Sequence, residues 1–480
     1  MDEQQNVPSR PVNPRRRPRS KFQIFKEAYL PVIIAGAAVL LILIFVIGSI
    51  VRAVQRGNAE QAASQQAASQ QAAEEARLAQ EQTRLLEEAA VFAQNYYYDN
   101  AISVLKTFSG DMSKYPTLSL KLAEYQAAQN AMVAWDDPTK VPNLSFHLLM
   151  ADPQRAFAHE EYGTAFNKNY LTTTEVSRML QQLYDNGYVL VSMDDLFTVS
   201  KDVYGTTVLT QKTLYQPEGK KPIMLTQTNV NYNIYMVDSE EDEDLLPDKD
   251  GAGFANRLIL DENGKFTCQM VDSSGNTVTG AYDLVPILEA FVEEHPDFSY
   301  RGAKATLALS GYNGVFGYRT YSGADSDFGA DAYQSDLAEA KKVAAALIES
   351  GYELACYTYN NRGYGNYNTD VVKEDVQKWI SETKDILGTV DTLVYAQNSD
   401  IAPAGVYSGD KYKVLRDAGF CFYLGFCENG QNWTTVANEY ARMGRILVNG
   451  TNLAYHAQWF TGIFDAAQVL DSAARGTVPN

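Results

Sequence analysis

The chain has 480 residues, 45% of them hydrophobic, and a formal net charge of −19. This length is too great for one ordinary core, so we expect two or more units. So acidic a chain is unsuited to nucleic acid, whose protein partners present basic surfaces.

The N-terminal region predicts a membrane anchor. Residues 1–28 are polar and rich in Pro and Arg, and residues 29–51 form a nearly unbroken apolar run without charge. At about 1.5 Å per residue this run is long enough to cross a ~30 Å hydrocarbon core. Seven Lys and Arg precede it and only Arg52 and Arg56 follow closely, which places the N-terminus in the cytoplasm and the rest outside the membrane. A cleaved signal peptide is the alternative, although no A-x-A site closes the run.

The next two segments predict helices. Residues 52–84 repeat a five-residue Gln-Ala-Ala-Ser-Gln unit, so they favour helix without an apolar stripe. We interpret them as a solvated stalk; a coiled coil is less well supported, because its core positions would hold Ala or Gln. Residues 85–137 show helical periodicity with a break near Gly110 and Pro116, which predicts a helical hairpin. One pair cannot form a repeat array, so we expect a neck, with a protein partner as its alternative role.

Alternating strand and helix signals fill residues 141–480 and predict an α/β domain of about seven βα units around a parallel sheet. The expected strands are 144–150, 188–191, 305–309, 353–357, 392–395, 420–426 and 446–448. The expected helices are 173–186, 283–294, 335–350, 370–387, 411–418 and 465–474. Insertions at about 239–282 comprise an acidic run, 239–250, and a hairpin, 257–282. The acidic run lacks the spacing of a calcium loop, so a solvated insertion is favoured.

The stretch 221–232 joins a short apolar strand to a polar cluster. Ile223 to Leu225 follow a proline, and Gln227, Thr228 and Asn229 come directly after them. Parallel α/β folds place their chemistry at the carboxyl ends of buried strands.

This stretch resembles the catalytic strand of the polysaccharide deacetylase (NodB-like carbohydrate esterase) family, which ends in Thr-Phe-Asp-Asp-Gly-Tyr or a close variant. Three further blocks, residues 141–147, 183–196 and 349–361, are similar to blocks of that family. The resemblance covers about two thirds of the chain, and it implies a distorted (β/α) barrel.

The resemblance also assigns positions to a metal-dependent reaction. In the family the first aspartate is the base, and the second holds Zn²⁺ with two histidines four residues apart. Thr228 stands at the base position, and Asn229, Tyr357 and Asn361 stand at the ligand positions. All four groups are therefore replaced.

The replacements predict a protein without the catalytic metal. A neutral amide is a weak Zn²⁺ ligand, and a phenol with a pKa near 10 coordinates only when strongly activated. The four histidines, His147, His159, His295 and His456, form no H-x-x-x-H pair. We therefore expect no cofactor, and Zn²⁺ or another divalent metal only if divergent ligands sustain activity. The four cysteines lack C-x-x-C spacing, so we expect buried free thiols, with one disulfide as the alternative.

Aromatic and amide side chains near the expected strand ends indicate a glycan groove. Aromatic faces and hydrogen-bonding groups suit pyranose rings, although similar loops also occur without a ligand. The candidates are Tyr232, Tyr312, Asn313, Tyr359, Arg362, Tyr364 and His456. The hypothesis is thus a membrane-anchored, extracytoplasmic, deacetylase-like protein that has lost catalysis and binds glycan or acts as a scaffold at the cell envelope. The alternatives are an active deacetylase of N-acetylated cell-wall polysaccharide and a structural envelope protein.

Overall fold

The computed structural model describes residues 29–236 and 252–479. The predictions for the polar tail, residues 1–28, and for the acidic run, residues 239–250, fall outside these ranges. The chain divides into two compact units, residues 1–83 and 84–480.

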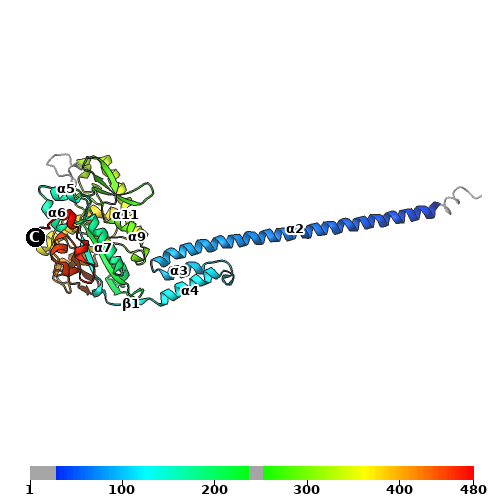
Figure 1. The fold of residues 1–480 in the computed structure, drawn as a ribbon, viewed down its shortest axis with the longest axis horizontal. Coiled ribbons are helices and arrows are strands. Elements are labelled where there is room, and N and C mark those ends of the chain that lie inside the picture. Colours follow the sequence, from blue (N-terminus) through cyan, green and yellow to red (C-terminus); the bar gives the residue numbers. More distant parts are fainter. Residues whose placement is uncertain (1–28, 237–251, 480) are drawn as a thin grey trace, which may run out of the picture. The chain divides into compact units, whose positions relative to one another are not determined.

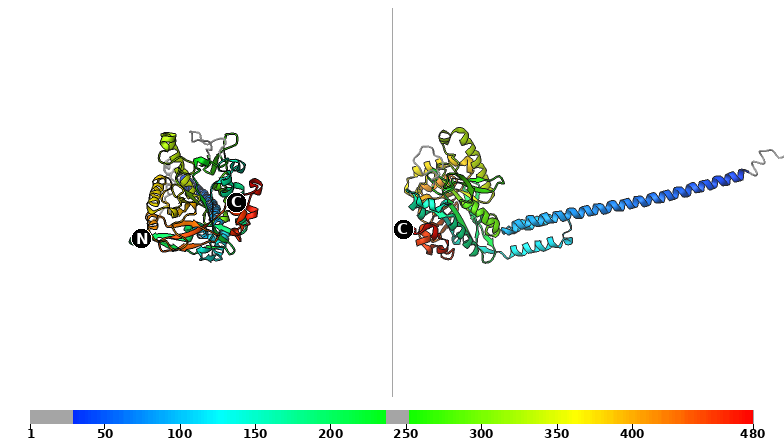
Figure 2. Two further views of the ribbon diagram at one scale, coloured as in Figure 1. Left: turned by 90° about the vertical axis from the view of Figure 1, so that its left-hand side faces the viewer. Right: turned by 45° about the horizontal axis from the view of Figure 1, so that its top comes forward.

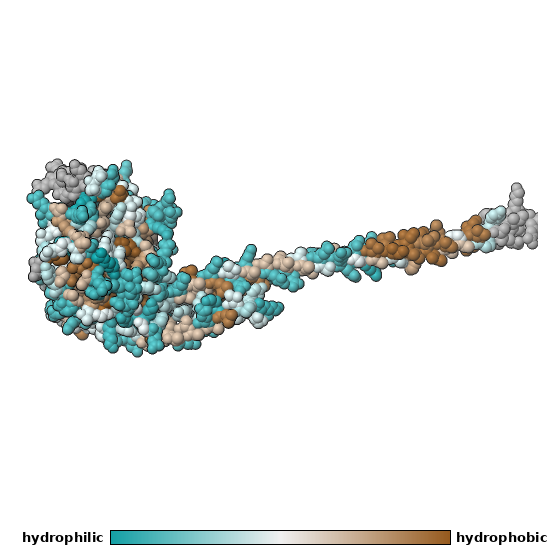
Figure 3. Space-filling model, in the orientation of Figure 1, coloured by the Kyte–Doolittle hydropathy of each residue, from teal (hydrophilic) through white to brown (hydrophobic). Residues whose placement is uncertain are grey.

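Helix α2, Leu30–Gln94, runs without a break through the predicted membrane span and stalk (Figure 1). Figure 3 shows a hydrophobic band along the N-terminal part of this helix, and hydrophilic residues follow it. By length and composition the helix can cross a membrane, and none of its apolar window is buried within the protein. Ion pairs of Arg77 with Glu74 and Glu81, at 2.7 and 3.0 Å, support the exposed part of the helix.

The neck consists of the end of α2 followed by α3, Tyr98–Lys106, and α4, Pro116–Asn130. Apolar side chains of the three helices are buried, among them Leu85, Leu105 and Leu118. Tyr96 has a φ of 63° and separates α2 from α3. Its hydroxyl donates to the carbonyl of Asp297 at 2.7 Å, so the start of the neck is bonded to the main body.

The main body is a closed barrel of seven parallel strands: β2 (Asn143–Phe146), β9 (Lys221–Thr228), β13 (Thr306–Leu309), β14 (Glu353–Cys356), β15 (Thr392–Val394), β16 (Phe422–Phe426) and β18 (Ala441–Leu447). Each strand pairs with the next in chain order, and β18 returns to pair with β2. The predicted distorted (β/α) barrel is confirmed. Its carboxyl strand ends meet at one rim, here termed the mouth.

Two additions distort the barrel. Strand β5, Tyr188–Leu190, pairs with the first residues of β9, below the point where β2 begins. Strand β17, Thr434–Val436, runs antiparallel to the first residues of β18. It stands in the connection from β16 to β18, where a regular barrel would have a helix.

Five longer helices connect the barrel strands: α7 (Thr173–Asp185), α9 (Leu284–Glu294), α11 (Ala330–Glu349), α12 (Thr369–Leu387) and α13 (Asp410–Asp417). Figure 2 shows helices arranged around the strands of this domain. Helix α7 illustrates why they form: Thr172 and Glu175 make a capping box, and Val176, Met179, Leu180 and Leu183 are buried along one face. Fully burying such a side chain is worth about 1.5–3 kcal/mol.

The insertion at 257–282 has three strands where the sequence predicted one hairpin: β10 (Arg257–Leu260), β11 (Phe266–Val271) and β12 (Thr277–Gly280). Both predicted turns are present, with Gly264 and Gly275 at φ of 77° and 81°, and two turns make a three-stranded meander. The sequence did not predict three small pairs: β1 (Val133–Trp135) with β8 (Leu214–Gln216), β3 (Leu149–Met150) with β4 (Leu171–Thr172), and β6 (Phe197–Lys201) with β7 (Thr207–Gln211).

The C-terminal segment corrects one prediction. The expected helix 465–474 is divided into α15, Ala466–Val469, and α16, Ser472–Arg475. Leu470 is extended, with a ψ of 126°, and the N–H of Asp471 donates to Glu175 at 2.9 Å rather than continuing the helix. Shorter helices elsewhere are α5 (Pro153–Ala158), α6 (Gly163–Asn169), α8 (Met193–Leu196), α10 (Ala324–Phe328) and α14 (Gly450–Tyr455). All four cysteines are free and buried, as predicted.

Candidate functional site at the barrel mouth

Thr228, at the family's base position, ends β9 and is 1% exposed. Its Oγ1 lies 2.7 Å from Nδ1 of His147, the residue after β2. Unlike a carboxylate, the hydroxyl of Thr228 cannot act as a general base near neutral pH. The next residue, Asn229, has a φ of 62°, and its buried Oδ1 has no hydrogen-bond partner among the described residues.

Tyr357 and Asn361 follow β14, on the other side of β13. The N–H of Tyr357 donates to the carbonyl of Leu309 at 2.9 Å, and its side chain is 7% exposed. Asn361 has a φ of 49°, and its buried Oδ1 also lacks a partner within the described ranges. Thr358 between them has a φ of 57° and a buried, unpartnered hydroxyl. The mouth thus presents neutral oxygens at three positions.

A buried cation, Arg445 of β18, interacts with Tyr357 and with His147. Its guanidinium donates to Ser145 Oγ at 2.8 Å and to the carbonyls of Gly425 and Tyr395 at 2.9 Å each. Burial lowers the pKa of Arg445, and its interaction with Tyr357 opposes that lowering. Arginine remains charged in proteins. Burial first, and the charge of Arg445 second, lower the pKa of His147 to about 4, so His147 is neutral at pH 7.

These residues do not fit a catalytic zinc ion. Zn²⁺ takes thiolate, imidazole or carboxylate ligands, whereas the three ligand positions offer two amides and a phenol. The fixed guanidinium of Arg445, which interacts with Tyr357, opposes a dication there. In the described part of the chain no three His, Cys, Asp or Glu side chains are grouped so that they could hold a metal ion.

Two of the expected groove tyrosines are part of the core. The hydroxyl of Tyr232 donates to Asp283 at 2.6 Å, and the hydroxyl of Tyr364 donates to Asp375 at 2.8 Å. Tyr232 is 1% exposed and Tyr364 is 0% exposed, so neither side chain can stack on a sugar. No sequence pattern predicts these two hydrogen bonds, because each joins residues of different elements.

The other candidates are divided between the mouth and the surface. Tyr312 and Tyr359 meet edge to face with ring centroids 5.9 Å apart, and Tyr312 is exposed. Asn313 has a φ of 61°, and Arg362 lies 3.5 Å from Asp375. His456 ends α14 and stacks on Trp459 at 4.6 Å.

Asp375 of α12 organises the loop after β14. Its carboxylate accepts hydrogen bonds from the N–H of Tyr359 at 2.7 Å and from the hydroxyl of Tyr364 at 2.8 Å, in addition to the ion pair with Arg362. Asp283, before α9, plays a similar part after β9: it accepts from Tyr232 and from Gln227, both at 2.6 Å. Burial raises the pKa of Asp283 to about 6. Neither aspartate was singled out by sequence.

Strained backbone is concentrated at the mouth. Of the ten non-glycine residues with positive φ in the described ranges, eight follow β9, β13, β14 or β15: Asn229, Tyr232, Asn313, Phe316, Thr358, Asn361, Gln397 and Asn398. Asparagine tolerates this conformation, but Tyr, Phe, Gln and the β-branched Thr do so at a cost. Such strain, on the order of 1–3 kcal/mol per residue, tends to cluster at functional sites.

The mouth also holds a hollow that the sequence did not predict. It has a volume of about 690 Å³, and the loops after β14, β15 and β16 form its walls. We term it the β15–β16 groove; its lining residues include Asn366, Asn398, Asp400, Phe426, Glu428, Asn429, Gln431 and Trp433. None of the seven candidate groove residues lines it. The one sequence feature that indicates this groove is the pair of aromatic residues Phe426 and Trp433, which flank a polar loop.

Buried Arg442 of β18 fixes both walls of this groove. Its guanidinium is 2.9 Å from Asp400 and donates to the carbonyls of Ala402, Pro403 and Gly405. The same group lies 5.1 Å from the ring of Trp433. Gly425 and Gly444 leave the space for that ring, since a Cβ at either position would come within 3 Å of it.

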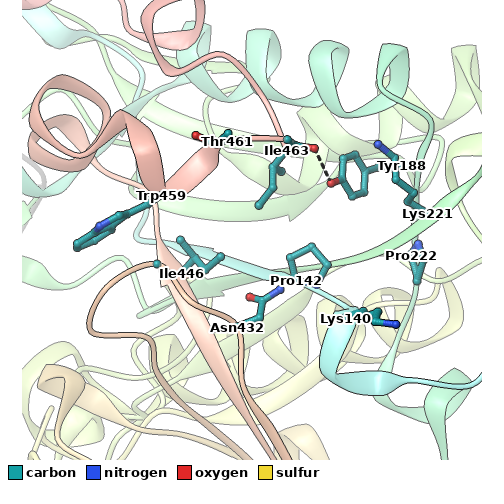
Figure 4. A pocket seen from close by; sticks show the side chains of 12 residues that line it. Lys140, Pro142, Tyr188, Lys221, Pro222, Asn432, Ile446, Trp459, Thr461 and Ile463 are labelled. Carbon is teal, nitrogen blue, oxygen red and sulfur yellow. Dashed lines mark hydrogen bonds between the residues drawn. The ribbon is translucent and has the colours of Figure 1, made fainter.

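A second hollow lies away from the mouth. Figure 4 shows its lining around the starts of β2 and β9, with Trp459 and Tyr188 on two sides. Its volume is about 270 Å³, and the Tyr188 hydroxyl donates to the carbonyl of Gly462 at 2.9 Å. It holds none of the candidate residues. A third hollow, of about 400 Å³, lies between His147 and α6.

Seven parallel strands closing in chain order, with helices outside and polar residues at the carboxyl ends, define a (β/α) barrel, the architecture that the sequence resemblance to NodB-like deacetylases implied. No protein-family model matches the chain, and no curated protein sequence matches it significantly. Among solved structures it is similar to the deacetylase PplD of Streptococcus pyogenes in complex with acetate, with 15% identity over 66% of this chain and 98% of that one. The TM-score is 0.34.

Two further solved structures match in the same way. One is a polysaccharide deacetylase from Bacillus cereus and the other a putative polysaccharide deacetylase from Bacillus anthracis. Each is 11% identical, covers 69% of this chain and 69% of its own, and has a TM-score of 0.34.

Proposed function

We propose that this deacetylase-like protein is catalytically inactive, is anchored in the cell membrane with its barrel outside, and binds glycan or acts as a scaffold at the cell envelope. The observation that carries the loss of catalysis is the set of groups at the mouth. Thr228 replaces the base, and Asn229, Tyr357 and Asn361 replace the ligands. The guanidinium of Arg445 interacts with Tyr357. Hydrolysis needs both an activated water and a group that takes its proton.

Binding does not need those groups. Stacking on aromatic rings and hydrogen bonding to hydroxyls require no metal, and the β15–β16 groove offers both kinds of contact. The anchoring rests on the apolar first third of α2, and the orientation rests on the basic residues before it. A scaffolding role would use the neck, where Val91 and Leu120 are 60% and 69% exposed.

The alternative, an active enzyme with divergent ligands, has one observation in its favour. The buried amide oxygens of Asn229 and Asn361 have no hydrogen-bond partner among the described residues. Amide oxygens bind hard cations.

Metal analysis and an activity assay on the detergent-solubilised chain distinguish the two. We expect less than stoichiometric zinc after incubation with the metal and dialysis, and no acetate release from chitin-type or peptidoglycan oligomers. Acetate release by the metal-treated protein that is abolished by Asn361→Ala would instead establish the active enzyme. An Asn263→Ala variant, changed in the exposed turn between β10 and β11, is the control.

A further inference from the structure

The β15–β16 groove has the features of a built binding site rather than a gap between loops. Arg442 is fully buried and bonds four groups of the loop 400–405. Gly365 allows that loop to approach the one after β14, because a Cβ there would lie 2.4 Å from the carbonyl of Asp400. Gln397 and Asn398, at φ of 51° and 52°, hold the start of the loop in a strained conformation. The walls are therefore fixed before any ligand arrives.

The lining of this groove combines aromatic surface with free polar groups. Phe426 and Trp433 supply the aromatic surface, and the indole N–H of Trp433 is already used by the carbonyl of Phe426 at 3.0 Å. Within the described ranges, the side chains of Asn398, Asn429 and Gln431 have no hydrogen-bond partner, so their amide groups are available to a ligand. Sugar hydroxyls both donate and accept hydrogen bonds, as amide groups do.

The charges that a ligand can reach in the groove are acidic. Its lining contains Asp400 and Glu428 but no Lys, Arg or His. Asp400 is neutralised by Arg442 at 2.9 Å, whereas the exposed carboxylate of Glu428 has no ion pair among the described residues. The cations Arg442 and Arg445 are 0% and 3% exposed and do not line the groove. The Nη groups of Arg442 donate to Asp400 and to loop carbonyls, and Arg445 donates to Ser145 and to two carbonyls. Direct contact therefore favours a ligand with a positively charged group.

We propose that the β15–β16 groove binds an oligosaccharide carrying free amino groups, with a sugar ring on the aromatic surface and an ammonium group at Glu428. This inference rests on the proposed glycan-binding function and specifies its ligand. The protein would then recognise the product of amide removal from an N-acetylated polymer. The reaction that supplies this ligand is hydrolysis of acetamido groups by another protein.

Binding of two matched oligomers to the detergent-solubilised chain tests the proposal. We expect the β-1,4-linked glucosamine tetramer to bind more tightly than the N-acetylglucosamine tetramer, by roughly two- to fivefold, as for an exposed charge pair. Glu428→Gln should abolish that difference, and added salt should reduce it. Glu349→Gln makes the same charge change at the far end of α11 and should leave the preference unchanged. Gln431→Ala should weaken both oligomers.

The outcomes separate this proposal from the broader one. Equal binding of both tetramers, unchanged in Glu428→Gln but weakened in Gln431→Ala, would overturn the amine preference and leave glycan binding in place. Tighter binding of the acetylated tetramer would also overturn the amine preference and leave glycan binding in place. Binding of neither tetramer would overturn the amine preference together with the proposed glycan binding, and would leave the scaffolding role.

Discussion

Glu175 and Arg475 form an ion pair in which both side chains are fully buried. Nη2 of Arg475 lies 2.6 Å from Oε2 of Glu175, and the same arginine donates to Asn167 and Tyr170. The pair joins the capping box of α7 to the last helix of the chain across 300 residues of sequence. The pair therefore attaches the segment that follows β18 to the start of α7.

Breaking this pair should destabilise the domain. Arg475→Ala leaves the Glu175 carboxylate buried without its counter-charge, so we expect a loss of about 3–5 kcal/mol in the free energy of unfolding. Urea unfolding measures it. Arg178→Ala removes the partly exposed pair with Asp471, at 3.7 Å, and should cost less than about 1 kcal/mol. Equal losses in the two variants would contradict the structural role of the buried pair.

A zinc site should be recoverable at the mouth. The combined changes Thr228→Asp, Asn229→Asp, Tyr357→His and Asn361→His restore the family's groups, and Arg445→Met removes the opposing cation. Calorimetry should detect stoichiometric zinc binding by the variant with all five substitutions. The variant with four substitutions, which keeps Arg445, should bind zinc more weakly. If neither binds zinc while circular dichroism shows an intact fold, these positions do not converge on a metal site.

Glu353 should make stability depend on pH. Burial, and then the nearby charge of Asp194, raise the pKa of Glu353 from 4.5 to about 8. Between these values the folded state binds a proton that the unfolded state lacks, so stability from this group falls as pH rises from about 4.5 to 8. The slope is at most about 1.4 kcal/mol per pH unit.

Urea unfolding of wild type and Glu353→Gln at pH 5 and pH 8 tests this effect. The wild type should lose more stability than the variant between the two values. Asp283 and His147 titrate in both proteins, so the difference isolates Glu353. Glu349→Gln, an exposed acid four residues earlier, should behave as wild type; parallel pH profiles for all three proteins would show that Glu353 does not titrate in this range.

The predicted topology can be tested on intact cells. Seven basic residues before the apolar run and two after it predict that the N-terminus lies in the cytoplasm. Protease added outside should therefore digest the chain beyond Arg56 and leave a short membrane-protected fragment. A cytoplasmic marker protein is the control for cell integrity. Full protection of residues 57–480 would show the opposite orientation.

The barrel could be predicted from the sequence because its signals are local. The apolar face of α7, the glycine at 187 and the short strand after it lie within a few residues of one another. The expected strands after residue 300 each overlap an observed barrel strand, whereas the expected strand 144–150 is divided into β2 and β3, and the expected strand 188–191 is β5, outside the closed barrel. The helix expected at 465–474 was wrong because its break depends on Glu175, which is distant in sequence.

The candidate site was harder to predict because it depends on distant partners. Tyrosine is a residue type typical of binding surfaces, so the sequence favoured Tyr232 and Tyr364 as groove residues. In the structure both side chains are buried, with their hydroxyls bonded to Asp283 and Asp375. The β15–β16 groove is shaped by Arg442, whose role depends on loop carbonyls about 40 residues earlier in the chain. Residue types alone carry no signal for such an arrangement.

The strained turn at Gln397 links stability to function at the mouth. Gln397 is exposed, so Gln397→Gly removes a left-handed glutamine without opening a cavity. If this turn had no role in binding, a glycine at position 397 would cost nothing in function. It would also make the domain more stable, because glycine adopts this conformation without strain. A gain in melting temperature accompanied by weaker oligosaccharide binding would therefore mean that the protein gives up stability to keep a rigid groove.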